Sequence, residues 1–218
     1  MDISAITFVL ELIGTAAFAI SGVIVARESE MDLLGAIVLG LATAVGGGMI
    51  RDTVLGHLPP NALVNPVYGT VAVAACVIMF CILYFYGNSH EESPFYQYTL
   101  ELADCIGLAI FAVVGVQATL VTLHSDNAVL AVFTGVITAV GGGMIRDVLA
   151  GQVPFILKEK IYAVAALAGS CLYFALIDLQ LVDPAVAIAL SVAATMIIRL
   201  LSLKFGWNLP RLKKNSKG

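Results

Sequence analysis

The chain has 218 residues, of which 60% are hydrophobic and 12% are charged, and its mean hydropathy is +0.99. Soluble globular domains carry about 25% charged residues, so this composition excludes a soluble fold. The formal net charge of −4 gives no reason to expect a nucleic-acid partner. An apolar helix of about 20 residues crosses a bilayer core, and the length allows about seven of them. The composition therefore predicts an all-α membrane protein with no separate soluble domain.

Seven apolar segments follow one another along the chain, separated by turn-forming residues. They cover residues 3–26, 31–50, 62–86, 98–121, 127–145, 160–177 and 183–203. We expect one transmembrane domain over residues 1–205 and a basic tail over residues 206–218.

The basic residues predict the orientation, because loops on the cytoplasmic side carry an excess of Lys and Arg. With the C-terminus inside, Arg51 alone lies outside and nine basic residues lie inside: Arg27, Arg146, Lys158, Lys160, Lys204, Arg211, Lys213, Lys214 and Lys217. The predicted location is the cell (inner) membrane, crossed several times, with the N-terminus outside and the C-terminus in the cytoplasm. A Lys-rich tail there would lie against anionic lipid head groups.

An internal repeat organises the spans. The ten residues 43–52 (TAVGGGMIRD) recur unchanged at 138–147, and flanking positions match as well. The first repeat covers about residues 3–87 and the second about 98–178, with a seventh helix at about 183–204. Each repeat holds three spans, an odd number, so the second copy enters the membrane from the opposite side. In proteins built this way, binding and permeation sites lie near the pseudo-two-fold axis.

Three successive glycines occupy both copies of the motif: Gly46, Gly47 and Gly48 in the first, and Gly141, Gly142 and Gly143 in the second. One interpretation is a kink or break in each helix beside an aqueous path, where freed carbonyls coordinate cations. The other is close helix packing, because small residues recur at four-residue spacing in both spans.

An arginine and an aspartate follow both glycine runs, as Arg51-Asp52 and Arg146-Asp147. Charges inside a membrane are costly and normally pair or face water. Adjacent helical residues point about 100° apart, so we predict that each Arg pairs across the repeats, Arg51 with Asp147 and Arg146 with Asp52, or with carbonyls at the opposite glycine run. The alternative is that these residues are ordinary interfacial helix ends.

Further polar residues fall on the inner faces of the predicted helices. Glu11 and Asp104 occupy equivalent places in spans 1 and 4, and two carboxylates there suit cations. The candidate site also includes Thr43 and Thr138 of the repeated motif. Arg199 in span 7 is either a structural clamp on carbonyls or part of a pore. All three histidines fall in loops, so no bound metal is expected beyond permeating K+ or Na+.

The 3+3+1 plan and the duplicated GGGMIRD sequence resemble the prokaryotic branch of the trimeric intracellular cation (TRIC) channels, over about residues 3–205. The resemblance implies a homotrimer with a pore in every protomer, permeable to K+ and Na+ and lined by two helices kinked at the glycines. It implies no cofactor. The same sequences also resemble a group described as glycine transporters.

Three functions are therefore compared. A passive monovalent cation channel explains the inverted repeat and the inner-face carboxylates. A carrier for a small zwitterion such as glycine would use a helix N-terminus for the carboxylate and Asp52 or Asp147 for the ammonium. A structural subunit leaves the duplicated charges unexplained. The sequence has no Gly-rich phosphate loop or hydrolase motif, so we do not expect an enzyme. Partners beyond the membrane lipids and further copies of the chain are not predicted.

Overall fold

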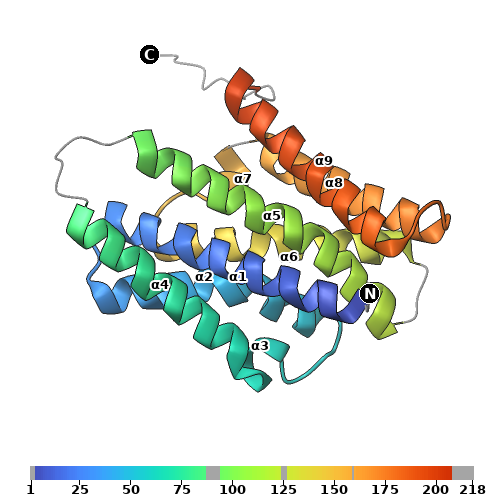
Figure 1. The fold of residues 1–218 in the computed structure, drawn as a ribbon, viewed down its shortest axis with the longest axis horizontal. Coiled ribbons are helices and arrows are strands. Elements are labelled where there is room, and N and C mark those ends of the chain that lie inside the picture. Colours follow the sequence, from blue (N-terminus) through green and yellow to red (C-terminus); the bar gives the residue numbers. More distant parts are fainter. Residues whose placement is uncertain (1–2, 87–93, 124–126, 159, 208–218) are drawn as a thin grey trace, which may run out of the picture.

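The computed structural model describes residues 3–86, 94–123, 127–158 and 160–207, and this part of the chain is helical throughout, without strands (Figure 1). The helices are α1 (Ile3–Glu28), α2 (Leu33–Val54), α3 (Asn61–Val64), α4 (Pro66–Tyr86), α5 (Pro94–Leu123), α6 (Ala128–Leu149), α7 (Phe155–Lys158), α8 (Lys160–Asp178) and α9 (Pro184–Phe205). Seven of them are long and apolar enough to cross a membrane, which confirms the predicted all-α, seven-span fold. Most of the predicted tail, from residue 208 on, lies outside the described residues, as do His90 and His124.

Helices α2 and α6 end later than predicted. They continue to Val54 and Leu149, so each Arg-Asp pair lies inside its helix rather than after it. Both helices end where a glycine, Gly56 or Gly151, adopts a φ of 70°. This left-handed conformation costs glycine little and closes a helix C-terminus.

Equivalent contacts hold together the two triplets of long helices, α1–α2–α4 and α5–α6–α8. The Cys76 thiol of α4 lies 4.0 Å from the Ala19 carbonyl oxygen of α1, and the Ser170 hydroxyl of α8 donates to the Ala112 carbonyl of α5 at 3.3 Å. Cys76 corresponds to Ser170 and Ala19 to Ala112 when the two repeats are aligned. The predicted repeat therefore includes the third helix of each triplet.

The two triplets meet where α2 crosses α6 at the glycines. A Cβ atom added to Gly47 would collide with the carbonyl oxygen of Thr138, and one added to Gly142 would collide with that of Thr43. Only residues without a side chain allow backbones this close, so the structure supports the packing interpretation. Both helices run through their glycines without interruption. The predicted break with freed carbonyls is therefore wrong for this structure, while bending at the glycines stays a prediction.

Helix α9 lies outside the repeat and covers one side of it. It packs against α8 and α5, whereas α4 lies on the opposite side of the bundle (Figure 1). Its first half joins a separate apolar cluster with Val113, Val116 and Tyr173, through Ala187 and Ile188. The second triplet therefore has a helical cover that the first triplet lacks among the residues that the structure describes.

Candidate functional site

A buried charge cluster occupies the end of α2, and we call its members Glu11, Arg51, Asp52 and Tyr68 the first cluster. Arg51 Nη1 donates to Glu11 Oε1 at 3.0 Å, and Arg51 Nε donates to Asp52 Oδ1 at 2.8 Å. The Tyr68 hydroxyl donates to the other oxygen of Glu11. The Arg51 and Asp52 side chains are each 6% exposed and that of Glu11 is 13% exposed. A single arginine thus satisfies carboxylates from α1 and α2.

The second cluster, Asp104, Arg146, Asp147 and Tyr162, repeats this arrangement at the end of α6. Arg146 Nη1 donates to Asp104 Oδ1 at 2.7 Å, and Arg146 Nε donates to Asp147 Oδ1 at 2.8 Å. These side chains are at most 2% exposed, so the second cluster is more deeply enclosed than the first.

The prediction that the arginines pair across the repeats is wrong. Both form ion pairs with the next residue and with the first helix of their own triplet. The 100° between adjacent side chains does not prevent this, because Nε lies partway along the arginine and reaches back to the neighbouring carboxylate, while the terminal nitrogens extend to α1 or α5. The alternative of ordinary interfacial ends also fails, because Arg51 and Arg146 are only 5% and 0% exposed.

One contact of the second cluster does connect the repeats. Arg146 Nη1 also donates to the Ser21 hydroxyl of α1 at 3.0 Å, and Ser21 in turn donates to the Phe18 carbonyl. The corresponding position in α5 is Val114, which has no polar side-chain atom to offer Arg51.

Each aspartate of the motif also fixes the chain after its helix. Asp52 Oδ2 accepts from the backbone N–H of Asn61 at 2.8 Å, and Asp147 Oδ2 accepts from that of Phe155 at 2.7 Å. These amides begin the four-residue helices α3 and α7. Sequence reasoning missed them, as it missed Tyr68 and Tyr162, although extending the repeat comparison to spans 3 and 6 would have aligned the two tyrosines.

The carboxylates that the first helix of each triplet contributes to the clusters, Glu11 and Asp104, differ by one methylene group. Glu11 is long enough for Tyr68 to reach it, whereas the equivalent carboxylate, Asp104, is shorter. In the described part of the chain, Asp104 Oδ2 and the Tyr162 hydroxyl are buried without a hydrogen-bond partner, as is Arg146 Nη2. Polar atoms enclosed in this way are costly unless water reaches them.

Helix α9 buries one polar face: Ser191, Thr195 and Arg199 are at most 3% exposed. The Arg199 guanidinium lies 5.1 Å from the centre of the Tyr162 ring, a cation–π distance beside the second cluster. Repeat one has no counterpart of this arginine.

The two motif threonines form hydrogen bonds within their own helices. The Thr43 hydroxyl donates to the Leu39 carbonyl and the Thr138 hydroxyl to the Thr134 carbonyl, and both residues are fully buried. Their hydroxyls lie beside Gly22 of α1 and Gly115 of α5, so these side chains are packed inside the bundle and do not face open space in this structure.

Two cavities meet the first cluster. A vestibule of about 480 Å³ opens between α1 and α5 and reaches Glu11, Arg51 and Asp52, with His57 in its wall. A small cavity of about 20 Å³, room for about one water molecule, lies behind it between Tyr68 and Phe111. No group of three His, Cys, Asp or Glu side chains able to hold a metal lies within the ranges that the structure describes.

The centre between the clusters is aromatic. The Phe18 and Phe111 rings lie 5.3 Å apart, and each also packs against a glycine of the other helix, Gly107 and Gly14. Two pseudo-equivalent side chains thus fill the middle of the bundle, and a charge cluster lies on either side of them.

Comparisons with known proteins agree with this architecture. The family model described as "Glycine transporter" matches residues 8–84 and 101–178, one match for each triplet. The inner membrane protein YadS of Escherichia coli, a UPF0126 protein, is 35% identical over 96% of this chain and 97% of its own. Among solved structures, a TRIC cation channel studied for its conductance is 41% identical, covers 96% of this chain and 98% of its own, and has a TM-score of 0.82. The TRIC orthologue from Rhodobacter sphaeroides is 35% identical over 93% and 99%, with a TM-score of 0.83.

The fold and the paired clusters define a multi-pass membrane protein of the channel and transporter class, built on an inverted repeat. Within that class, the chain belongs to the prokaryotic TRIC family.

Proposed function

We propose that the chain is a monovalent cation channel for K+ and Na+, with a path through each protomer of a homotrimer. The relatives described as TRIC cation channels support the channel activity, and those described as trimeric support the assembly. The path runs from the vestibule past the first cluster and the central phenylalanines to the second cluster, between α2 and α6.

The charge of the first cluster is the observation that carries this proposal. The two carboxylates Glu11 and Asp52 outnumber Arg51, so the formal charge of the cluster is one negative at the inner end of the vestibule. A carboxylate excess lining an aqueous entry attracts cations and repels anions. Arg199 lies beside the second cluster, where one arginine also faces two carboxylates, so the added positive charge balances that cluster.

Conduction requires the buried ion pairs to move, because Arg146 and Asp104 fill the second cluster at 0% and 2% side-chain exposure. In this proposal, α2 and α6 bend at their glycines and draw the clusters apart. Glycine weakens a helix by about 1 kcal/mol relative to alanine, which makes these the natural points of bending. The structure then represents a closed conformation.

Planar bilayer recording tests the proposal. Purified trimers in a KCl gradient should give single-channel currents that reverse near the K+ equilibrium potential and far from that of Cl−, and bi-ionic K+/Na+ recording then gives the permeability ratio of the two cations. Glu11→Gln, which removes the excess negative charge, should reduce the cation over anion permeability ratio, while Glu28→Gln at the far end of α1 should leave it unchanged. Folded trimers that carry no current would refute the channel.

A carrier for a small zwitterion such as glycine is the second candidate. The vestibule places Arg51 and Glu11 side by side, so one site offers a partner for a carboxylate and one for an ammonium. The family model's description names glycine. Uptake of labelled glycine into vesicles would then saturate and proceed without channel currents; uptake that is absent or linear in concentration would exclude the carrier.

The proposed setting is the inner membrane with the N-terminus outside. Inner-membrane relatives support the location. Labelling of single cysteines placed at Ser4 and Lys204 by a membrane-impermeant thiol reagent, in a background without native cysteines, tests the orientation. Ser4 should react in intact cells and Lys204 only after lysis, and the reverse pattern would invert the topology.

A further inference from the structure

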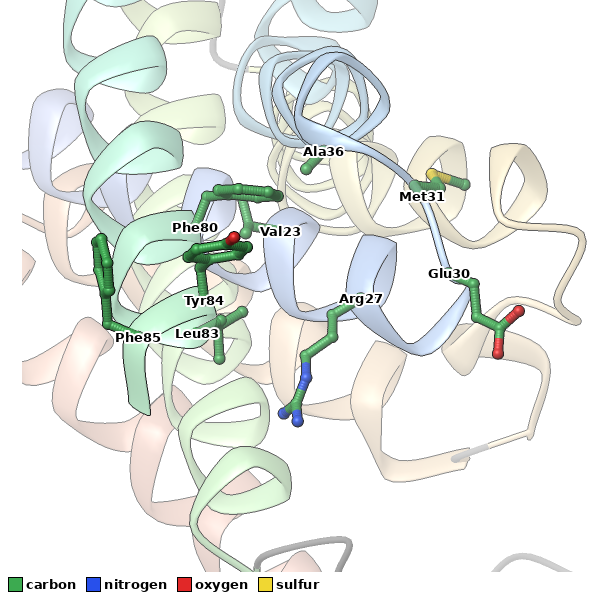
Figure 2. Close-up of a pocket in the computed structure, with 9 residues that line it drawn as sticks. All are labelled: Val23, Arg27, Glu30, Met31, Ala36, Phe80, Leu83, Tyr84 and Phe85. Carbon is green, nitrogen blue, oxygen red and sulfur yellow. The ribbon is translucent and has the colours of Figure 1, made fainter. Parts of the chain in front are cut away.

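A pocket of about 530 Å³ lies at the end of the bundle where α1 and α4 finish, away from both charge clusters. Figure 2 shows Phe80 and Tyr84 of α4 beside Val23 of α1, with Arg27 and Glu30 toward the end of α1 and the connection that follows. The pocket therefore joins an apolar, aromatic wall to a pair of opposite charges at one end of the membrane spans.

The repeat shows what covers the equivalent place in the second triplet. Five pocket residues correspond to members of the apolar cluster beneath α9: Val23 to Val116, Arg27 to Leu120, Ala36 to Ala131, Phe80 to Phe174 and Leu83 to Ile177. In the second triplet this face is closed by Ala187 and Ile188 of α9. Among the described residues, the pocket is thus the counterpart, without a covering helix, of a surface that α9 closes in the second triplet.

The substitutions between the two copies indicate a different occupant for the first. Arg27 and Glu30 stand where the second repeat has Leu120 and Leu123. An apolar helix fits the leucines, whereas two opposite charges beside an apolar wall complement a molecule with a charged head and an apolar body. Phospholipids have that chemistry, and charged and aromatic residues at span ends are where their head groups lie.

We propose that a phospholipid with an amine-bearing head group, of the phosphatidylethanolamine type, occupies this pocket and covers the face that α9 covers in the second repeat. Its phosphate accepts hydrogen bonds from Arg27, its ammonium pairs with Glu30, and its acyl chains lie along Val23, Leu83 and Phe80. The Arg27 guanidinium stacks 4.1 Å from the centre of the Tyr96 ring.

Native mass spectrometry tests this proposal without reference to transport. Purified protein is mixed with palmitoyl-oleoyl phosphatidylethanolamine or with the phosphatidylglycerol of the same chains. The wild type should retain the phosphatidylethanolamine more strongly. Arg27→Leu, which copies Leu120, should weaken retention of both lipids roughly tenfold, the effect of losing a charged hydrogen bond. Glu30→Gln should reduce the preference for phosphatidylethanolamine over phosphatidylglycerol, because it removes only the partner of the amine.

Lys204→Leu is the matched control, since Lys204 is an exposed cation 5.8 Å from the Phe205 ring in the last turn of α9 and outside the pocket. It should retain both lipids as the wild type does. Equal retention of the two lipids by the wild type, or the same loss in Lys204→Leu as in Arg27→Leu, overturns the proposal. Loss of the trimer in Arg27→Leu with lipid retention unchanged would assign the pocket to a second copy of the chain instead. If Arg27→Leu does not fold, Glu30→Gln decides alone, because Glu30 is exposed.

Discussion

Arg146 of the second repeat donates a hydrogen bond of 3.0 Å to the hydroxyl of Ser21 in the first. The bond holds the second cluster against α1, and Val114 at the equivalent place gives the first cluster no such contact. Ser21→Val should therefore lower the free energy of unfolding by about 1.5–3 kcal/mol, the range for a hydrogen bond to a charged group, and raise channel open probability. Thermal unfolding in detergent and bilayer recording measure the two effects.

The reciprocal change provides the control. Val114→Ser offers Arg51 a hydroxyl at the equivalent position and should leave stability unchanged or raise it. If Ser21→Val and Val114→Ser shift the unfolding temperature in the same direction and by the same amount, the Ser21 contact has no special role.

The close approach of α2 and α6 predicts opposite outcomes at neighbouring glycines. A methyl group at Gly47 collides with the Thr138 carbonyl, whereas one at Gly48 has only Arg51 Nη2 near it, at 3.8 Å. Gly47→Ala should destabilise by about 1–3 kcal/mol through overpacking. Gly48→Ala should be neutral or stabilise by up to about 1 kcal/mol through helix propensity. Equal unfolding temperatures for the two variants would contradict the packing role.

The length of the carboxylate side chain beside each tyrosine predicts opposite changes in the free energy of unfolding for two substitutions. Asp104→Glu extends the carboxylate toward Tyr162, as Glu11 extends to Tyr68, and should give the buried hydroxyl a partner. We expect a gain of about 1 kcal/mol in the free energy of unfolding, with a comparable loss for Glu11→Asp. Chemical unfolding followed by tryptophan fluorescence at Trp207 measures both. A loss in both variants would show that the second cluster has no room for the longer side chain.

The charge of the second cluster depends on Arg199, and its replacement separates the two roles considered for it. Arg199→Gln removes the positive charge 5.1 Å from the Tyr162 ring. If Arg199 acts on the pore, the cluster gains a net negative charge, so single-channel K+ conductance should rise. If it is a structural clamp, unfolding temperature should fall while conductance per open channel stays the same.

Asp52 pairs with Arg51 and also accepts a hydrogen bond from the first backbone N–H of α3. Asp52→Asn keeps the size of the side chain but removes a charge from a buried pair with Arg51 and replaces one of its two acceptor oxygens. Breaking one side of a buried ion pair costs roughly 3–5 kcal/mol. Thr53→Val in the next, exposed position is the control and should change the unfolding temperature little. Stability near that of the wild type in Asp52→Asn would show that water compensates the lost charge.

Much of this architecture is determined by local and periodic features of the sequence. The hydropathy of the sequence predicted the number of spans. A segment that crosses a membrane must be apolar, and it must be a helix because only then are its backbone polar groups hydrogen-bonded to one another. The identical residues 43–52 and 138–147 revealed the repeat and the positions of both Arg-Asp pairs, and the odd number of spans in each copy predicted its inversion. Helix ends were less predictable, since the apolar pattern stops at the Arg-Asp pairs while the helices continue to the turns at Gly56 and Gly151.

The tertiary structure decided which groups meet. The sequence placed Arg51, Asp52, Arg146 and Asp147 near a common axis but could not assign their partners, because an arginine side chain is long enough to reach several carboxylates at similar distance. Packing selected Glu11 and Asp104 on the neighbouring helices and added Ser21 to one side only. The repeat does not predict where α9 packs, because this helix lies outside it. In the structure α9 covers one copy of a duplicated face, while the other copy, among the described residues, forms the pocket at Arg27.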